Sequence, residues 1–72
     1  MNQLMYRRSG DTQWSQPIPT NETAPEGAVK HAEHITRYGV DGQGPKVGRM
    51  TDWRFLRDKV CIKAWSMVVA PL

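Results

Sequence analysis

The chain contains a single cysteine, Cys61, and no long apolar run. One cysteine excludes an intramolecular disulfide, so packing alone must hold the fold together and a reducing compartment fits best. The longest apolar stretch, residues 66–72, is far too short to span a bilayer. No apolar run follows the charged residues near the N-terminus, so no signal peptide is expected. These absences favour a cytoplasmic protein without a membrane partner.

Length and composition favour one small folded domain. The 72 residues lie near the lower size limit for a chain that folds without disulfides or metals. Charged residues make up 24% of the chain, which argues against wholesale disorder. We therefore expect residues 1–72 to form a single domain.

Two segments near the N-terminus predict a β-hairpin. Residues 3–8 and 12–18 flank residues 9–11, a glycine-containing loop of hairpin length. Pro17 cannot donate a hydrogen bond to a neighbouring strand, so the second strand is expected at the edge of a sheet.

A helix is predicted over residues 25–38. Its apolar residues recur at helical spacing on one face: Ala28, Val29, Ala32 and Ile35. Thr23 is the expected N-cap, and Glu26 three residues later completes a capping box. Gly39 is expected to end the helix in the left-handed conformation. The glycine-rich residues 39–48 then form a flexible loop.

The C-terminal stretch has to supply most of the core, because it holds two of the three tryptophans and the only phenylalanine. It predicts two strands, residues 50–56 and 60–69, joined by a turn at residues 57–59. An alternative helix has five residues at the required spacing: Trp53, Leu56, Val60, Ala64 and Met67. Strands are favoured, because β-branched residues prefer them and several would lie on the polar side of the helix. The predicted fold is therefore α+β, with a small antiparallel sheet of two hairpins and one helix packed on one face, in the order β-β-α-β-β.

A regular second hairpin assigns its side chains to two faces. The face expected to cover the helix carries Trp53, Phe55, Val60, Ile62 and Ala64. On the other face, Arg54 is expected directly opposite Lys63, with Trp65 beside them. Like charges opposite each other cost stability, so this pair indicates an anionic partner.

The formal net charge of +3 comes from basic residues in the C-terminal half. Such one-sided charge favours an acidic protein surface or a nucleic acid as the partner. Basic side chains interleaved with an aromatic suit both kinds of partner. The predicted partner-binding residues are Arg54, Arg57, Lys59, Lys63 and Trp65.

Catalytic and metal chemistry find little support in the sequence. His31 and His34 lie one helical turn apart, but a zinc site needs three or four ligands. Cys61 could act with either histidine as nucleophile and base, but no glycine-framed turn accompanies them. We expect no catalytic residue, no metal and no cofactor. An enzyme or metal site built on these three residues is a third class of function, and a structural subunit of a larger complex is a fourth.

Part of the chain resembles the small RNA polymerase inhibitors encoded by bacteriophages. The similarity consists of short matches: Pro17-Ile18, Glu22-Thr23, Glu26, Ala28, Ala32-Glu33 and Val69-Ala70-Pro71. The resemblance implies a single small domain of strands around one helix, which binds the host polymerase and blocks transcription. In this chain Lys63 is the only basic residue of the last strand, where the family has arginines, and residues 39–48 are an insertion.

These observations predict a non-enzymatic binding module that modulates or inhibits a larger host protein by occupying its surface. The partner would be a protein with an acidic surface, and the resemblance implies RNA polymerase. The alternative is a small basic protein that binds nucleic acid through the same residues. For a phage-encoded protein, the expected location is the cytoplasm of a bacterial host.

Overall fold

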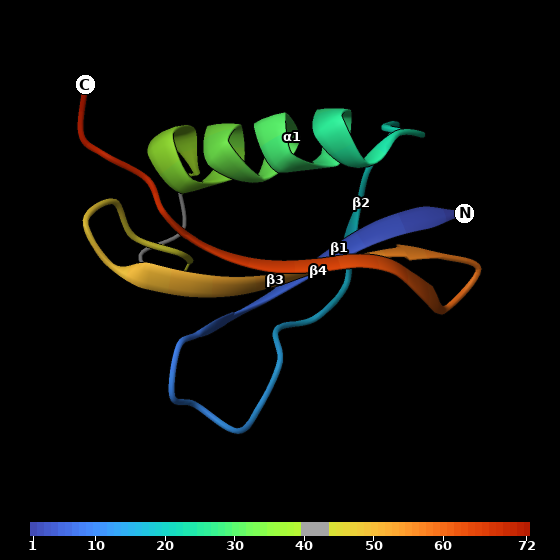
Figure 1. The fold of residues 1–72 in the computed structure, drawn as a ribbon, viewed down its shortest axis with the longest axis horizontal. Helices are drawn as coiled ribbons and strands as arrows, with labels where there is room; N and C mark the ends of the chain where they lie inside the picture. Colours follow the sequence, from blue (N-terminus) through green and yellow to red (C-terminus); the bar gives the residue numbers. More distant parts are fainter. Residues whose placement is uncertain (40–43) are drawn as a thin grey trace.

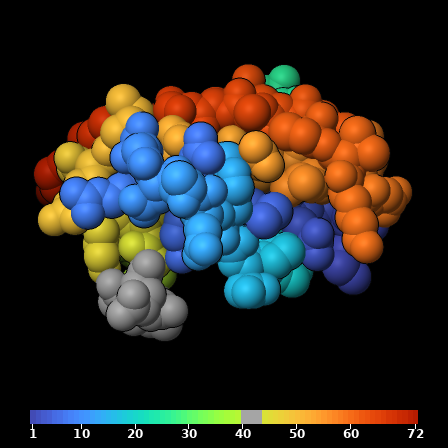
Figure 2. Space-filling model, turned by 90° about the horizontal axis from the view of Figure 1, so that it is seen from below, coloured from blue at the N-terminus to red at the C-terminus, as the bar shows by residue number. Residues whose placement is uncertain are grey.

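The computed structural model describes residues 1–39 and 44–72, in which the chain forms one helix and four strands. In chain order these are β1 (Asn2–Arg8), β2 (Ile18–Pro19), α1 (Pro25–Tyr38), β3 (Met50–Arg57) and β4 (Val60–Val68). The strands form one antiparallel sheet in the order β2-β1-β3-β4, and α1 packs on one face (Figure 1). This confirms the predicted α+β fold. The face away from α1, here called the outer face, is crossed by residues 9–17 (Figure 2).

The first hairpin is shorter than predicted, because β2 contains only two residues. Residues 12–17 do not form a strand. Ser15 takes the place of a neighbouring strand instead: its backbone N–H donates to the Tyr6 carbonyl at 2.7 Å, and its hydroxyl accepts from the Tyr6 N–H at 3.0 Å. Pro17 and Pro19 cannot donate to a ladder, which explains why regular pairing is confined to the end of this segment.

The bounds predicted for the helix are confirmed, but its predicted N-cap is wrong. The N-cap is Ala24, and no side chain caps the first turn. Pro25 begins the helix, where its missing N–H costs nothing because that group would be unpaired in any case. Thr23 makes a hydrogen bond through its backbone instead of its side chain: its carbonyl accepts from the Arg57 guanidinium at 2.6 Å. A hydrogen bond from the end of β3 thus reaches the residues before the helix, where the capping box was predicted.

Gly39 follows the helix, but it is not left-handed as predicted. Its φ is −63° and its ψ is 135°, which is an extended conformation open to other residues. A side chain is excluded for a different reason: a Cβ atom here would lie 2.5 Å from the Ile35 carbonyl oxygen. The loop predicted for residues 39–48 lies in part outside the described residues, and its described part, residues 44–48, contains turns and bends.

The second hairpin is confirmed, and the alternative helix is therefore excluded. Asp58 and Lys59 form the turn, with φ values of 50° and 68°. A turn with two consecutive left-handed residues matches the right-handed twist of the flanking strands. Such turns are therefore common where a two-residue loop connects the two strands of a hairpin.

The register of β4 differs from the prediction by one residue. Near the turn, Leu56 pairs with Cys61 as in a regular hairpin, but the next pair is Phe55 with Lys63, so that Ile62 is an additional residue. This β-bulge exchanges the two faces of the rest of β4. As a result Arg54 lies opposite Ala64 rather than Lys63. The predicted repulsion between two cations is absent.

The bulge also places a second tryptophan against the core. Trp65 lies opposite Trp53, and their rings stack with centroids 6.1 Å apart and planes inclined by 11°. The fully buried core consists of Leu4, Ala28, Ala32, Trp53 and Phe55. Val60 and Ile62, which were expected to cover the helix, are exposed instead.

Candidate binding site on the outer face

The residues predicted to bind a partner do not share one surface. Arg54 is on the outer face of β3, whereas Lys63 and Trp65 pair with Phe55 and Trp53 on the face that carries α1. Arg57 is tied to the residues before the helix, as described above, and Lys59 lies in the turn. The predicted cluster around Arg54, Lys63 and Trp65 is therefore wrong as a single face. Whether any of these residues binds a partner stays a prediction.

A row of polar side chains crosses three strands on the outer face. Arg7 of β1 lies opposite Asp52 of β3, and its Nε is 2.9 Å from the carboxylate Oδ2. The hydroxyl of Ser66, opposite Asp52 on β4, donates to the other carboxylate oxygen at 2.7 Å. The Ser66 hydrogen bond, and then that from Arg7, lower the pKa of Asp52 below its ordinary value of 3.8. The ionised carboxylate therefore holds the Arg7 side chain against the sheet.

Trp14 lies over this row. Its ring centroid is 4.5 Å from Cζ of Arg7 and 4.1 Å from Cζ of Arg54, which are cation–π distances. Trp14 is half-buried, although it lies in an irregular segment. Two guanidinium groups on adjacent strands thus fix residues 9–17 onto the outer face.

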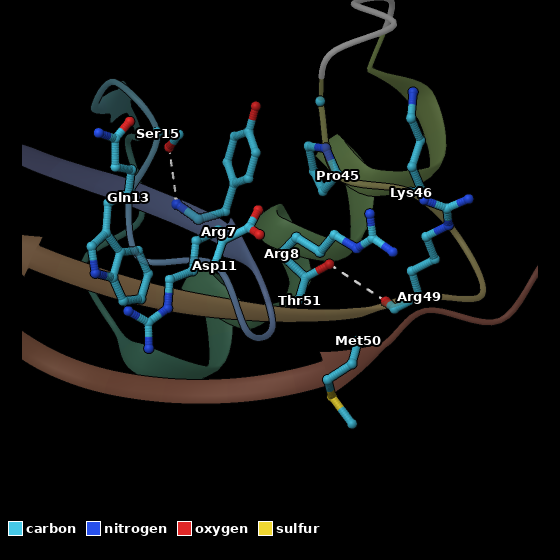
Figure 3. A pocket seen from close by; sticks show the side chains of 13 residues that line it. Arg7, Arg8, Asp11, Gln13, Ser15, Pro45, Lys46, Arg49, Met50 and Thr51 are labelled. Atoms are coloured by element: carbon cyan, nitrogen blue, oxygen red, sulfur yellow. Dashed lines mark hydrogen bonds between the residues drawn. The ribbon is translucent and has the colours of Figure 1, made fainter.

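A pocket of about 640 Å³ opens between this segment and the residues before β3 (Figure 3). It is lined by Tyr6, Arg7, Arg8, Asp11, Gln13, Trp14, Ser15, Gly44, Pro45, Lys46, Arg49, Met50 and Thr51. In Figure 3, Lys46 and Arg49 gather at one end of the pocket and Gln13 lies toward the other. We call this the basic pocket.

The lining of the basic pocket is rich in positive charge. Its described residues include four cationic side chains and one carboxylate, that of Asp11. Arg7 is neutralised by Asp52, but within residues 1–39 and 44–72 no ion pair involves Arg8 or Arg49. Guanidinium groups donate in a planar fork that matches carboxylate and phosphate oxygens. The chemistry of the pocket is therefore that of an anion-binding site.

All six aromatic residues of the chain have partners within the fold, and each lies in the described part. Phe55 and Trp53 are buried, and Trp65 stacks on Trp53. Tyr6 packs on Trp53 with ring centroids 5.4 Å apart, and Tyr38 packs on His34 at 4.8 Å. With Trp14 held by two arginines, the described surface offers no aromatic ring that is without an intramolecular contact.

The histidines and the cysteine lie in different environments. His31 is bound through Nδ1 to the Thr20 hydroxyl at 2.7 Å, and His34 contacts Tyr38. Cys61 is exposed on β4, where its thiol donates to the Lys63 carbonyl at 3.5 Å. Within the described ranges, no three side chains of the metal-binding types gather. In the described part of the chain, neither histidine is hydrogen-bonded to the Cys61 thiol.

Sequence reasoning missed most of the basic pocket. Arg7, Arg8 and Trp14 were assigned to a two-stranded ribbon, so their meeting at one pocket was not expected. A signal was present, because two adjacent arginines and a tryptophan stand at the two ends of one short loop. Arg49 and Lys46 were recognised as excess charge without a place in the fold.

The part of the chain that the structure describes has no helix with the length and apolar character needed to cross a membrane. Comparisons with known protein families, curated proteins and solved structures give no match to this chain.

Proposed function

We propose that the protein is a non-enzymatic binding module that modulates a larger host protein by occupying an acidic surface on it. The contact is made by the basic pocket, together with the adjoining part of the outer face around Trp14. The resemblance to phage-encoded transcription inhibitors makes bacterial RNA polymerase the first candidate partner, and the bacterial cytoplasm the place of action.

The observation that carries the proposal is the charge of the basic pocket. Arg8 is the last residue of β1 and Arg49 directly precedes β3, so strand pairing brings to one pocket two guanidinium side chains that have no carboxylate partner among the described residues. The planar guanidinium fork loses less side-chain entropy per hydrogen bond when it binds a carboxylate, which favours arginine in protein interfaces. An acidic protein surface would supply the missing partners.

The engagement of all three tryptophan rings supports a protein partner over a single-stranded nucleic acid. Proteins that bind single strands stack bases on exposed aromatic rings. Here Trp14 is occupied by Arg7 and Arg54, and Trp65 by the core. Binding to nucleic acid would have to rest on phosphate contacts alone, and it is the second candidate function because the same cations suit phosphates.

The hydroxyl groups at the pocket support a role in binding rather than catalysis. The Ser15 hydroxyl donates to the Gln16 carbonyl and accepts from the Tyr6 N–H. The Thr51 hydroxyl donates to the Arg49 carbonyl. Among the described residues, neither is hydrogen-bonded to a histidine or a carboxylate that could activate it as a nucleophile.

The proposal is tested with purified bacterial RNA polymerase, by calorimetry and by transcription from a promoter template. The wild-type chain should bind the enzyme and reduce transcript formation. Arg49→Glu should weaken binding by at least about ten-fold, roughly 1.4 kcal/mol, because it reverses a charge at the pocket. Lys30→Glu is the matched control, since it makes the same charge change on an exposed position of α1, and it should leave affinity within about two-fold.

A different result would favour the second candidate. The chain would then not bind the polymerase, but would bind random-sequence DNA or RNA at physiological salt. An affinity that falls steeply as salt rises would identify a nucleic acid as the partner. Equal losses from Arg49→Glu and Lys30→Glu would remove the basic pocket from the contact.

A further inference from the structure

The two edges of the sheet are built differently. On the β1–β2 side, regular pairing is limited to Ile18 and Pro19, and Ser15 satisfies both backbone groups of Tyr6. Prolines and short strands are devices that prevent further strands from pairing. The opposite edge is β4, with nine residues, no proline and Lys63 as its only charged side chain. Of the two edges formed by the described strands, the β4 edge is the one open to another strand.

The backbone of β4 presents alternate groups to solvent. The Val69 carbonyl accepts from the Gly48 N–H at 2.9 Å, so Val69 is oriented toward the β3 side of the ladder. Backbone direction alternates along a strand, and the regular part of β4 begins after the bulge. The N–H and C=O groups of Ala64, Ser66 and Val68 therefore point away from β3, where no further strand lies among the described residues.

The side chains along this edge are apolar and exposed. Val60, Ile62 and Val68 retain 62%, 42% and 51% of their accessible surface, and Met50, which pairs with Val68, retains 46%. Trp65 is only half-buried beside them. A long, exposed edge with little charge is the kind that pairs with another strand.

We propose that β4 pairs antiparallel with β4 of a second copy of this chain, across a two-fold axis. The edge has a different character from the basic pocket: its apolar side chains complement an identical apolar strand, and a single lysine offers little to attract an acidic segment. In every register except the one centred on Lys63, the two lysines avoid facing each other. In each copy the β1–β2 edge is closed. Pairing therefore uses the single open edge of each copy and stops at a dimer instead of continuing to a fibre.

Dimerisation has a consequence for binding, although it does not depend on the proposed function. Antiparallel pairing about an axis perpendicular to the sheet keeps both helices on one side and both outer faces on the other. The dimer thus presents its two outer faces in the same direction. A partner with two acidic sites would be held by both.

Sedimentation equilibrium over a roughly hundred-fold concentration range tests the inference. The wild-type chain should shift from the mass of one chain to that of two. Ile62→Lys should raise the dissociation constant at least about ten-fold, because it places a charge on the edge. Val47→Lys is the matched control: Val47 is a similarly exposed residue, at 40%, that lies outside the strands, and the change should leave the constant within about two-fold.

A second variant addresses the backbone directly. Ala64→Pro removes an N–H that points away from β3, so it should give a monomer with an unchanged far-ultraviolet circular dichroism spectrum. A wild-type chain that stays monomeric at every concentration would overturn the proposal and leave the edge to a segment of another protein. A dimer that survives both Ile62→Lys and Ala64→Pro would also overturn it, because the contact would lie elsewhere.

Discussion

Asp52 lies in the middle of the outer face and receives hydrogen bonds from both neighbouring strands. Arg7 binds one carboxylate oxygen and Ser66 the other, so one side chain connects β1, β3 and β4. Arg7 in turn supports Trp14, which carries residues 9–17. Asp52 is thus a positioning residue for the wall of the basic pocket, and its ionisation state should affect the stability of that wall.

The stability of the fold should depend on pH through Asp52. Its pKa is lower in the folded chain than the ordinary 3.8, so the ionised form stabilises the fold. That contribution is present above about pH 4 and is lost as the pH falls below it through the folded value. Asp52→Asn should therefore cost about 1 kcal/mol near neutral pH, and the difference from wild type should shrink in acid.

Urea unfolding of both proteins at several pH values measures this difference. Asp11→Asn is the control, because Asp11 forms no ion pair among the described residues, and it should leave the unfolding free energy nearly unchanged at every pH. A difference between wild type and Asp52→Asn that stays constant down to about pH 2.5 would contradict the assignment.

At the scale of elements, the hairpin of β3 and β4 determines which side chains are buried. The bulge at Ile62 moves Trp65 and Met67 to the face of the core and leaves Ala64 and Ser66 on the outer face. Small side chains there leave Asp52 accessible to Ser66, while Trp65 extends the apolar surface around Trp53. The additional residue Ile62 thus determines which β4 side chains lie on each face of the sheet.

Alanine substitutions of the two stacked tryptophans test this register. Trp53→Ala should cost about 3–5 kcal/mol, because the side chain is fully buried. Trp65→Ala should cost roughly 1–3 kcal/mol, because the half-buried ring contributes area and a stacking contact. Both values come from urea unfolding at equilibrium. A Trp65→Ala protein as stable as wild type would indicate the regular register, in which Trp65 faces solvent.

The sequence predicted the helix and both strands of this hairpin well, because their periodicity and turn residues are local signals. The bulge was missed, since a regular register extrapolated from the turn leads directly to Arg54 opposite Lys63. The alternation of Trp65, Met67 and Val69 with small or polar residues was the available counter-signal. This alternation alone does not show which face of β4 is buried, because that depends on how β4 pairs with Trp53 on another strand.

The basic pocket could not be predicted in the same way. Arg8 and Arg49 are distant in the chain, and they meet because β1 pairs with β3 rather than with β4. Strand order is a property of the whole sheet and leaves no local pattern. Trp14 was misplaced for a related reason: the hydroxyl of Ser15 replaces a strand that hydrophobic alternation had predicted.

The whole molecule consists of three layers: α1, the sheet, and residues 9–17 on the outer face (Figures 1 and 2). β1 and β3 lie in the middle of the sheet and contribute Leu4, Trp53 and Phe55 to the core. β4 is bonded on one side only, and most of its residues are exposed. Stability is therefore concentrated in the two central strands.

Amide hydrogen exchange should reveal this distribution. At a concentration at which the chain is monomeric, amides of β1 and β3 should exchange slowest, and those of Ala64, Ser66 and Val68 should exchange rapidly. Raising the concentration should slow these three if β4 pairs with a second copy. Equal protection of β3 and of these β4 amides in the dilute monomer would contradict the strand order.

The near-parallel stack of Trp53 and Trp65 has an optical consequence. Two indole rings this close, with a fixed mutual orientation, couple their electronic transitions, and such coupling produces a pair of far-ultraviolet circular dichroism bands of opposite sign that a single ring does not give. The signal depends on the register of the β3–β4 hairpin and is lost when that hairpin unfolds. Trp14, held by two arginines on the opposite face, lies outside the stack, so its emission responds to what occupies the basic pocket. The chain therefore carries separate built-in optical reporters for its folding and for its ligand.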